Sequence, residues 1–212
     1  MNLSYKKVRR SIRPRQCKRF RFPYGEWGCL LLASVLILAR QFTSPYFPSC
    51  VVDDSILQMS WVRQFAQILG EGTWLPRWLP HSNGGYGSPI FTFYSPLVYY
   101  VTASLYWGTK SVVLSMKLVR FLGLFLSGLA MFTYAGALTS RKLALLVSLV
   151  YLVIPFHVLD ISYWSLYAEP WAWIWFPLIL IFLRNLLASE ERKILHLTGF
   201  SLSYSSSLCL HV

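Results

Sequence analysis

The chain has 212 residues, of which 55% are hydrophobic, 17% aromatic and 13% charged. A water-soluble domain of this length cannot bury so much apolar surface, whereas a protein with several membrane spans does not need to bury it. The composition therefore excludes an ordinary soluble domain and predicts an all-α, polytopic integral membrane protein.

The net charge of +12 is concentrated in an N-terminal tail. Residues 1–22 hold nine of the twenty Lys and Arg residues and no acidic residue. A basic tail ahead of an apolar segment keeps the N-terminus of a membrane protein in the cytoplasm, where it can contact anionic lipids. We therefore expect a cytoplasmic tail whose partner is membrane lipid rather than nucleic acid.

The first apolar segment, residues 27–39, follows this tail directly. A basic region before an apolar core is also typical of a signal peptide. Residues 44–50 offer no small-x-small cleavage site, so an uncleaved anchor that extends to about Thr43 is expected. The four Cys residues form no CxxC pair and the four His residues have no metal-ligand spacing. Neither a disulfide framework nor a zinc site is therefore predicted.

Residues 53–96 follow the anchor and contain three of the eight acidic residues. Asp53 or Asp54 is expected to cap a helix that ends at Gly70. Apolar side chains recur at helical spacing on one side of this helix, at Leu57, Trp61, Phe65, Ile68 and Leu69. Its other side carries the polar side chains of Gln58, Arg63, Gln64 and Gln67. The pattern predicts an amphipathic helix on the membrane surface. An irregular loop is expected next, over residues 73–90, because this segment holds three Pro and three Gly.

Four later uncharged segments are candidate spans, namely residues 121–138, 143–156, 170–183 and 194–212. Residues 91–107 are also apolar, but their Tyr, Ser and Thr content is typical of one helix that lies at an interface. If they cross the membrane, Arg141 and Lys142 fall outside; if they lie on the outer surface, both fall in the cytoplasm, where positive charges concentrate. We therefore predict five spans, a cytoplasmic N-terminus and a first outer loop over residues 44–117.

Two positions in this outer loop are candidates for chemistry. Asp53 and Asp54 can supply a general base or a metal ligand at the membrane boundary, or they can simply cap the surface helix. Arg77 stands between two prolines and two tryptophans. A guanidinium held in this way suits a phosphate, and it equally suits anchoring of the loop among lipid headgroups.

The next outer connection, residues 157–169, adds two acids to the same face of the membrane. Glu169 directly precedes an apolar segment, where an acid is expensive unless it is paired or hydrated. A Glu in the first helical turn before Pro170 is also favoured for purely structural reasons. Asp160 is the weaker candidate because it is simply an acid in a loop.

Two runs in the first loop, G-x-x-x-P-R-W (72–78) and G-Y-G-x-P-x-F-x-F-Y-x-P (85–96), are distinctive. Together with YAEPWAW (167–173), they resemble a bacterial family of integral membrane proteins described as 6-pyruvoyl-tetrahydropterin-synthase-related. The resemblance covers roughly residues 25–212. That family is similar to the GT-C superfamily of glycosyltransferases, which use polyprenyl-phosphate sugars.

The resemblance implies a GT-C-like fold in the bacterial inner membrane, with a catalytic first outer loop. Asp53 or Asp54 would act as base, and a second acid would be Glu169 or Asp160. Asp54 and Glu169 could hold a divalent metal. Arg77 would hold the donor phosphate, while the aromatic residues of the loop would stack on sugar or lipid, namely Trp74, Trp78 and Tyr86.

The chain departs from the GT-C pattern in two respects. Trp164 occupies a place where an Arg is expected, and about five spans replace ten or more. We therefore expect the N-terminal part of a glycosyltransferase that transfers sugar from a polyprenyl phosphate at the outer face. The alternative is a non-catalytic membrane scaffold or subunit. A transporter is disfavoured because no predicted span carries a charge at its centre.

Overall fold

The computed structural model describes residues 24–43, 54–161 and 167–188. Within these ranges the chain is helical, as expected, and its only β-type pairing is a bridge between Leu79 and Ser88. The helices are α2 (Tyr24–Thr43), α3 (Asp54–Gly70), the 3-10 turn η1 (Asn83–Gly85), α4 (Ile90–Phe93), α5 (Leu97–Thr109), α6 (Val112–Leu138), α7 (Arg141–Val153), α8 (Pro155–Leu159) and α9 (Glu169–Ala188).

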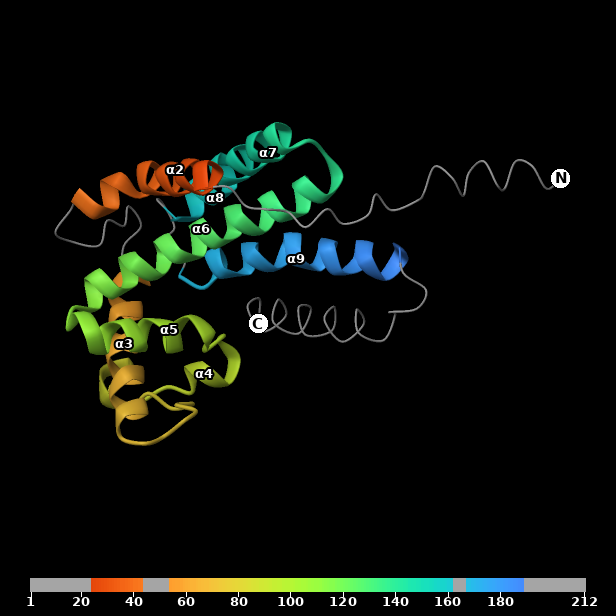
Figure 1. The fold of residues 1–212 in the computed structure, drawn as a ribbon. Coiled ribbons are helices and arrows are strands. Elements are labelled where there is room, and N and C mark those ends of the chain that lie inside the picture. The colour runs from red at the N-terminus through yellow and green to blue at the C-terminus, as the bar shows by residue number, and fades with distance from the viewer. Residues whose placement is uncertain (1–23, 44–53, 162–166, 189–212) are drawn as a thin grey trace, which may run out of the picture.

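Helices α2, α6, α7 and α9 form a bundle in which α6 is central and contacts the other three (Figure 1). Two glycines of α6 allow close packing. A Cβ atom at Gly123 would lie 3.0 Å from the indole of Trp171 in α9, and one at Gly128 would lie 3.0 Å from Leu152 in α7. Small residues at such crossings let helix backbones approach one another.

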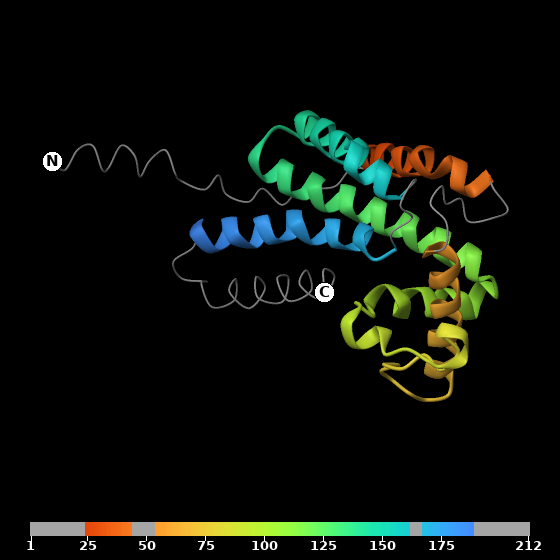
Figure 2. The same cartoon turned by 180° about the vertical axis from the view of Figure 1, so that it is seen from behind.

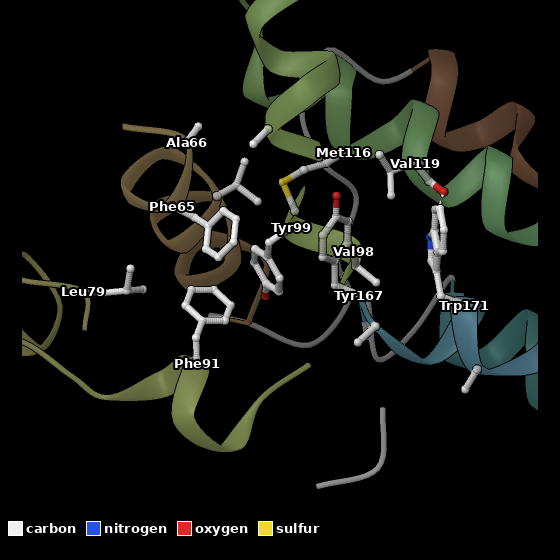
Figure 3. Packing of buried hydrophobic residues seen from close by; sticks show 14 residues of the cluster. Phe65, Ala66, Leu79, Phe91, Val98, Tyr99, Met116, Val119, Tyr167 and Trp171 are labelled. Atoms are coloured by element: carbon white, nitrogen blue, oxygen red, sulfur yellow. Dashed lines mark hydrogen bonds between the residues drawn. The ribbon is translucent and has the colours of Figure 1, made fainter. Parts of the chain in front are cut away.

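Helices α3, α4 and α5 form a second group at the N-terminal end of α6, as both views of the fold show (Figures 1 and 2). Helix α5 packs against α3 and against α6. The core between them is aromatic, with Phe65 of α3 and Tyr99 of α5 at its centre and Phe91 of α4 beside them (Figure 3). Tyr167 and Trp171 extend this core towards α9. The predicted outer loop is therefore packed onto the bundle end.

Two described helices are long and apolar enough to cross a membrane, Gly25–Thr43 and Val112–Leu138. The expected count of five spans is not reached in the described ranges. Helix α7 has 13 residues, fewer than the ~20 needed to cross a bilayer, because Pro155 disfavours helical backbone at the residue before it. Helix α9 has 20 residues, including Pro177, and is not one of the two. Residues 194–212 lie outside the described ranges, as do residues 1–22.

The surface helix and the segment after it correct two expectations. The helix over residues 54–70 is present, but Gln58 and Gln64, predicted on its polar side, are buried. Gln64 is retained there because it donates to Ser60 and accepts from the backbone N–H of His81 at 2.9 Å. Residues 91–107 form two helices rather than one, because Pro96 sets a break between α4 and α5.

The ends of the bundle are joined by specific polar contacts. Glu26 at the start of α2 accepts a hydrogen bond of 2.8 Å from Arg141 at the start of α7, within an ion pair. At the opposite end, Gln41 of α2 donates to the carbonyl of Ile161 at 3.1 Å. Helix α2 is thus antiparallel to α6, which is the arrangement expected if residues 91–107 do not cross between them.

Candidate functional site

A cluster of charged side chains lies where the N-terminal part of α6, the end of α8 and the start of α9 meet. Arg120 of α6 and Asp160, which follows α8, are both fully buried. Glu169, the first residue of α9, is half-buried. Buried charges are costly unless they are compensated, so such a cluster at one end of an apolar bundle is a candidate site.

The carboxyl groups of Asp160 and Glu169 lie beside each other. Neither Asp160 oxygen has a hydrogen-bond partner of ordinary geometry among the described residues. Burial, and then the neighbouring Glu169 carboxyl, raise the pKa of Asp160 to about 8, while Arg120 opposes this rise. Two acids that share one site usually hold a proton between them near neutral pH.

Arg120 is attached to the same connection through its guanidinium group. Its Nη1 donates to the carbonyl oxygen of Ile161 at 3.4 Å. The same oxygen accepts a hydrogen bond from Gln41. The carbonyl therefore ties α6 and α2 to the segment that carries Asp160. The positive charge of Arg120 therefore acts on the Asp160 carboxyl group and opposes the rise in its pKa.

Tyr167 connects the cluster to the outer helices. Its hydroxyl is hydrogen-bonded to the Thr102 hydroxyl of α5, and both side chains are fully buried. Burial raises the pKa of Tyr167, although its bond to Thr102 and the nearby Arg120 charge act in the opposite direction. The same ring packs edge-on against Tyr99, with centroids 5.5 Å apart. Tyr167 therefore stays neutral and links α5 to the residues that precede α9.

His157, which the sequence left without a role, packs inside the bundle. Its ring stacks on Trp173 with centroids 3.7 Å apart and meets Tyr151 edge-on at 4.7 Å. Burial lowers the pKa of His157 to about 4, so the imidazole is neutral at physiological pH. A neutral histidine between two aromatic rings is explained by packing alone.

The loop residues predicted to bind substrate lie elsewhere. Arg77 is exposed, and Trp74, Trp78 and Tyr86 are 84%, 54% and 90% exposed. The loop is attached to α5 by a hydrogen bond from the Tyr100 hydroxyl to the carbonyl of Trp74. Among the described residues, the charged groups that act on Asp160 are Glu169 and Arg120, and Arg77 is not one of them.

Within the loop, Leu79 pairs with Ser88 through the backbone, and the Trp78 ring lies beside Gly87. The Trp78 ring packs against Gly87, and a Cβ atom at Gly87 would lie 2.5 Å from this ring. Leu79, next in sequence, lies at the opposite side of the aromatic core from Trp171 (Figure 3).

The first predicted acids are only partly described. Helix α3 begins at Asp54, so the helix starts where the acidic pair predicts it, and the capping role stays a prediction. Asp53 and the side chain of Asp54 lie outside the described residues. In the described ranges, no three His, Cys, Asp or Glu side chains gather as a metal site would require. A metal held by Asp54 and Glu169 therefore stays a prediction.

Arg120 is the residue that reasoning from the sequence missed. The sequence predicts a span over the uncharged residues 121–138, whereas α6 begins at Val112 and includes Arg120. Arg120 is buried in the N-terminal third of α6 rather than at its centre, so the expectation that no span carries a charge at its centre is not contradicted. The available signal was an Arg only one residue outside a strongly apolar run, since such residues face a bundle interior when helical.

Comparison of the chain with protein-family models, with curated proteins and with solved structures finds no match in any of the three.

Proposed function

We propose that the chain forms part of a GT-C-like membrane glycosyltransferase that transfers a sugar from a polyprenyl phosphate at the outer membrane face. The observation that supports this most directly is the half-buried Glu169, with Asp160 and Arg120 behind it. A carboxyl group at the membrane boundary, backed by a second acid and a cation, is suited to proton transfer. Glu169 is also an acid named by the resemblance.

In this proposal Glu169 is the residue that touches the acceptor. Its carboxylate takes the proton of the acceptor hydroxyl while that oxygen forms a bond to C1 of the sugar. The bond between C1 and the phosphate oxygen breaks, and its electron pair leaves with the polyprenyl phosphate. General-base assistance of this kind contributes roughly 100-fold to 10,000-fold in rate.

Asp160 and Arg120 are positioning residues in this scheme, because both are fully buried. Asp160, with a pKa of about 8, keeps a proton beside Glu169, and Arg120 holds the pair in place through Ile161. Arg77 is the proposed phosphate ligand because its guanidinium is exposed. The resemblance instead gives the role of base to Asp53 or Asp54, but their side chains lie outside the described residues, so the proposal assigns this role to Glu169.

The test is transfer of labelled sugar from a polyprenyl phosphate by the purified full chain in lipid nanodiscs. Glu169→Gln is expected to lower kcat by about 100-fold or more, with an unchanged helical content by circular dichroism. The matched control is Glu71→Gln, which removes a carboxyl group from the exposed end of the α3 region. Equal transfer rates in Glu169→Gln and the unmodified chain would refute the proposal.

The exposure of the loop aromatics favours a second candidate function, a non-catalytic membrane scaffold or subunit. Trp74 and Tyr86 are 84% and 90% exposed, and aromatic side chains of this kind are enriched at membrane interfaces. For a scaffold, replacing both by Ala would weaken assembly or lipid contact, while Glu169→Gln would leave the same properties unchanged. The two variants therefore separate the two functions.

A further inference from the structure

A cavity lies at the junction of α5 and α6. It has a volume of about 640 Å³ and lies between α3, the chain at His81 and the α5–α6 connection. Cavities of roughly 300–1,000 Å³ accommodate small ligands. The residues of this cavity are distinct from Arg120, Asp160 and Glu169.

The lining of this cavity is basic. Arg63 of α3, Lys110 of the α5–α6 connection and His81 line it. No acidic side chain lines it in the part of the chain that the structure describes. Neither Arg63 nor Lys110 forms an ion pair with a described carboxylate. Two cations facing one cavity without a described counter-ion create a local positive potential.

The remaining walls include the polar side chains of Gln64 and Ser111, which are held by hydrogen bonds within the protein. Gln64 lines the cavity, is 5% exposed, and is held by the backbone N–H of His81 at 2.9 Å. Ser111, Val112 and Val113 also line it. Ser111 is the N-cap of the 27-residue helix α6, and its hydroxyl accepts from the N–H of Leu114. The N–H groups of Val112 and Val113 lack intrahelical acceptors, and such groups favour an anion.

Lys110 adopts an unusual backbone conformation at this site. It caps α5 in the left-handed region with φ 56° and ψ 12°. This conformation is uncommon for residues other than Gly, Asn and Asp. A lysine at this position therefore costs free energy that an Asn or Gly would avoid, which is consistent with a role for its charge.

We propose that this cavity, named here the α3–α6 cavity and lined by Arg63, His81, Lys110 and Ser111, binds a phosphate group. Arg and Lys with backbone N–H groups at a helix start form a common constellation for phosphate recognition. The phosphate belongs either to a soluble phosphomonoester or to a phospholipid headgroup. The cavity does not depend on the proposed transferase activity.

The first experiment uses the unmodified chain in detergent and follows acetylation of lysines by mass spectrometry. Inorganic phosphate and glycerol 3-phosphate represent the soluble source, and phosphatidylglycerol in mixed micelles, compared with phosphatidylcholine, represents the lipid source. Lys110 is expected to be protected several-fold by at least one of them. Lys142 is the internal control, because it is exposed at the start of α7.

Protection of Lys110 by soluble phosphate assigns a soluble ligand, and protection by phosphatidylglycerol alone assigns a headgroup. Equal labelling of Lys110 with and without every probe overturns the proposal, as does equal protection of Lys142. Chloride at the same ionic strength is included, because simple screening would act on both lysines alike.

The second experiment measures the half-saturating probe concentration from the rise in Tm on binding. Lys110→Asn removes the charge but tolerates the left-handed backbone, and Arg63→Gln removes the other cation. Each is expected to weaken binding by about 10-fold, as loss of one charge-assisted hydrogen bond does. Lys142→Gln should leave it unchanged. Unchanged binding in both cavity variants would contradict the proposal.

Discussion

Glu26 and Arg141 form an ion pair between the first turns of α2 and α7, although 115 residues separate them in the sequence. The pair places the start of the first helix next to the turn that joins α6 to α7. Both ends must then lie on one side of a membrane if α2 and α6 cross it. With nine Lys and Arg residues in residues 1–22, this side is expected to be the cytoplasm.

The first prediction concerns this topology. Single cysteines are placed at Ser104 on α5 and at Lys142 on α7, both exposed, in a chain whose four native cysteines are replaced by serine. In intact cells, an impermeant thiol reagent should label Ser104→Cys and should label Lys142→Cys only after lysis. Labelling of both positions in intact cells would be incompatible with the predicted arrangement.

The second prediction is a pH dependence of stability that arises at Asp160. Its pKa is about 8 in the folded chain, against the ordinary value of 3.8. The folded state therefore keeps a proton that the unfolded state has lost. Stability from this group is complete below about pH 4 and is lost as the pH rises through about 8.

Asp160→Asn should remove this pH dependence. At about pH 9 the variant should unfold at a higher temperature than the unmodified chain, because its free energy of unfolding should be larger by on the order of 1 kcal/mol or more. This difference in stability should be smaller at about pH 5. Thermal unfolding in detergent at both pH values provides the comparison, with Glu71→Gln as the control carboxyl. Parallel pH profiles for Asp160→Asn and the unmodified chain would show that Asp160 is not the group responsible.

The third prediction addresses the hydrogen bond between Tyr167 and Thr102, which joins the outer helices to the bundle. Tyr167→Phe keeps the ring and its contact with Tyr99 but leaves the Thr102 hydroxyl without this partner. The expected cost is about 1 kcal/mol of unfolding free energy. A double-mutant cycle with Thr102→Val isolates the pair. Additive effects of the two substitutions would mean that the bond contributes nothing.

The fourth prediction tests the packing of α6 on α9. Gly123→Leu would drive a side chain into the Trp171 indole, which lies 3.0 Å from the position of a Cβ atom and donates to the carbonyl of Val119 at 3.3 Å. Overpacking should cost about 1–3 kcal/mol and lower Tm.

Gly28→Leu is the matched control for this substitution, because nothing lies within 4 Å of a Cβ atom at Gly28 in α2. Both changes gain the same helix propensity of roughly 1 kcal/mol. Gly28→Leu should therefore leave Tm unchanged or raise it. A similar Tm for the two variants would contradict the close approach of α6 and α9.

The fifth prediction concerns the exposed aromatic loop. Gly87 has φ 80°, and a Cβ atom there would lie 2.5 Å from the Trp78 ring. Gly87→Ala should displace Trp78 and speed limited proteolysis of the loop. Gly72→Ala is the control, because it has φ 97° but nothing within 4 Å, so it isolates the backbone strain alone. Equal proteolysis in both variants would show that contact with Trp78 is unimportant.

The helical character of the chain and several helix boundaries follow from local sequence. Gly70 ends α3, Pro96 precedes α5 and Pro155 separates α7 from α8. Each of these residues acts through its own backbone restrictions, whatever surrounds it. The candidate role of Glu169 also came from local sequence, because an acid beside an apolar segment is unusual in any fold.

Which polar side chains of α3 are buried could be determined only from the tertiary structure. Gln58 and Gln64 are polar residues on the expected outer face of α3, yet they are buried because α3 packs on α5 and on the loop as well as on α6. Their neighbours come from distant segments, which helical spacing does not reveal. Periodicity predicts which residues share a face, whereas only packing decides what covers each face.

The sequence by itself determined an apolar, helical chain with a basic N-terminus, a long loop rich in Trp and Pro, and a notable acid at Glu169. Only the tertiary structure decided that Asp160, the weaker candidate, lies beside Glu169, and that the buried Arg120 acts electrostatically on Asp160. The physical reason is that charge–charge interaction and desolvation depend on distance and burial, and both are set by how α6, α8 and α9 pack together.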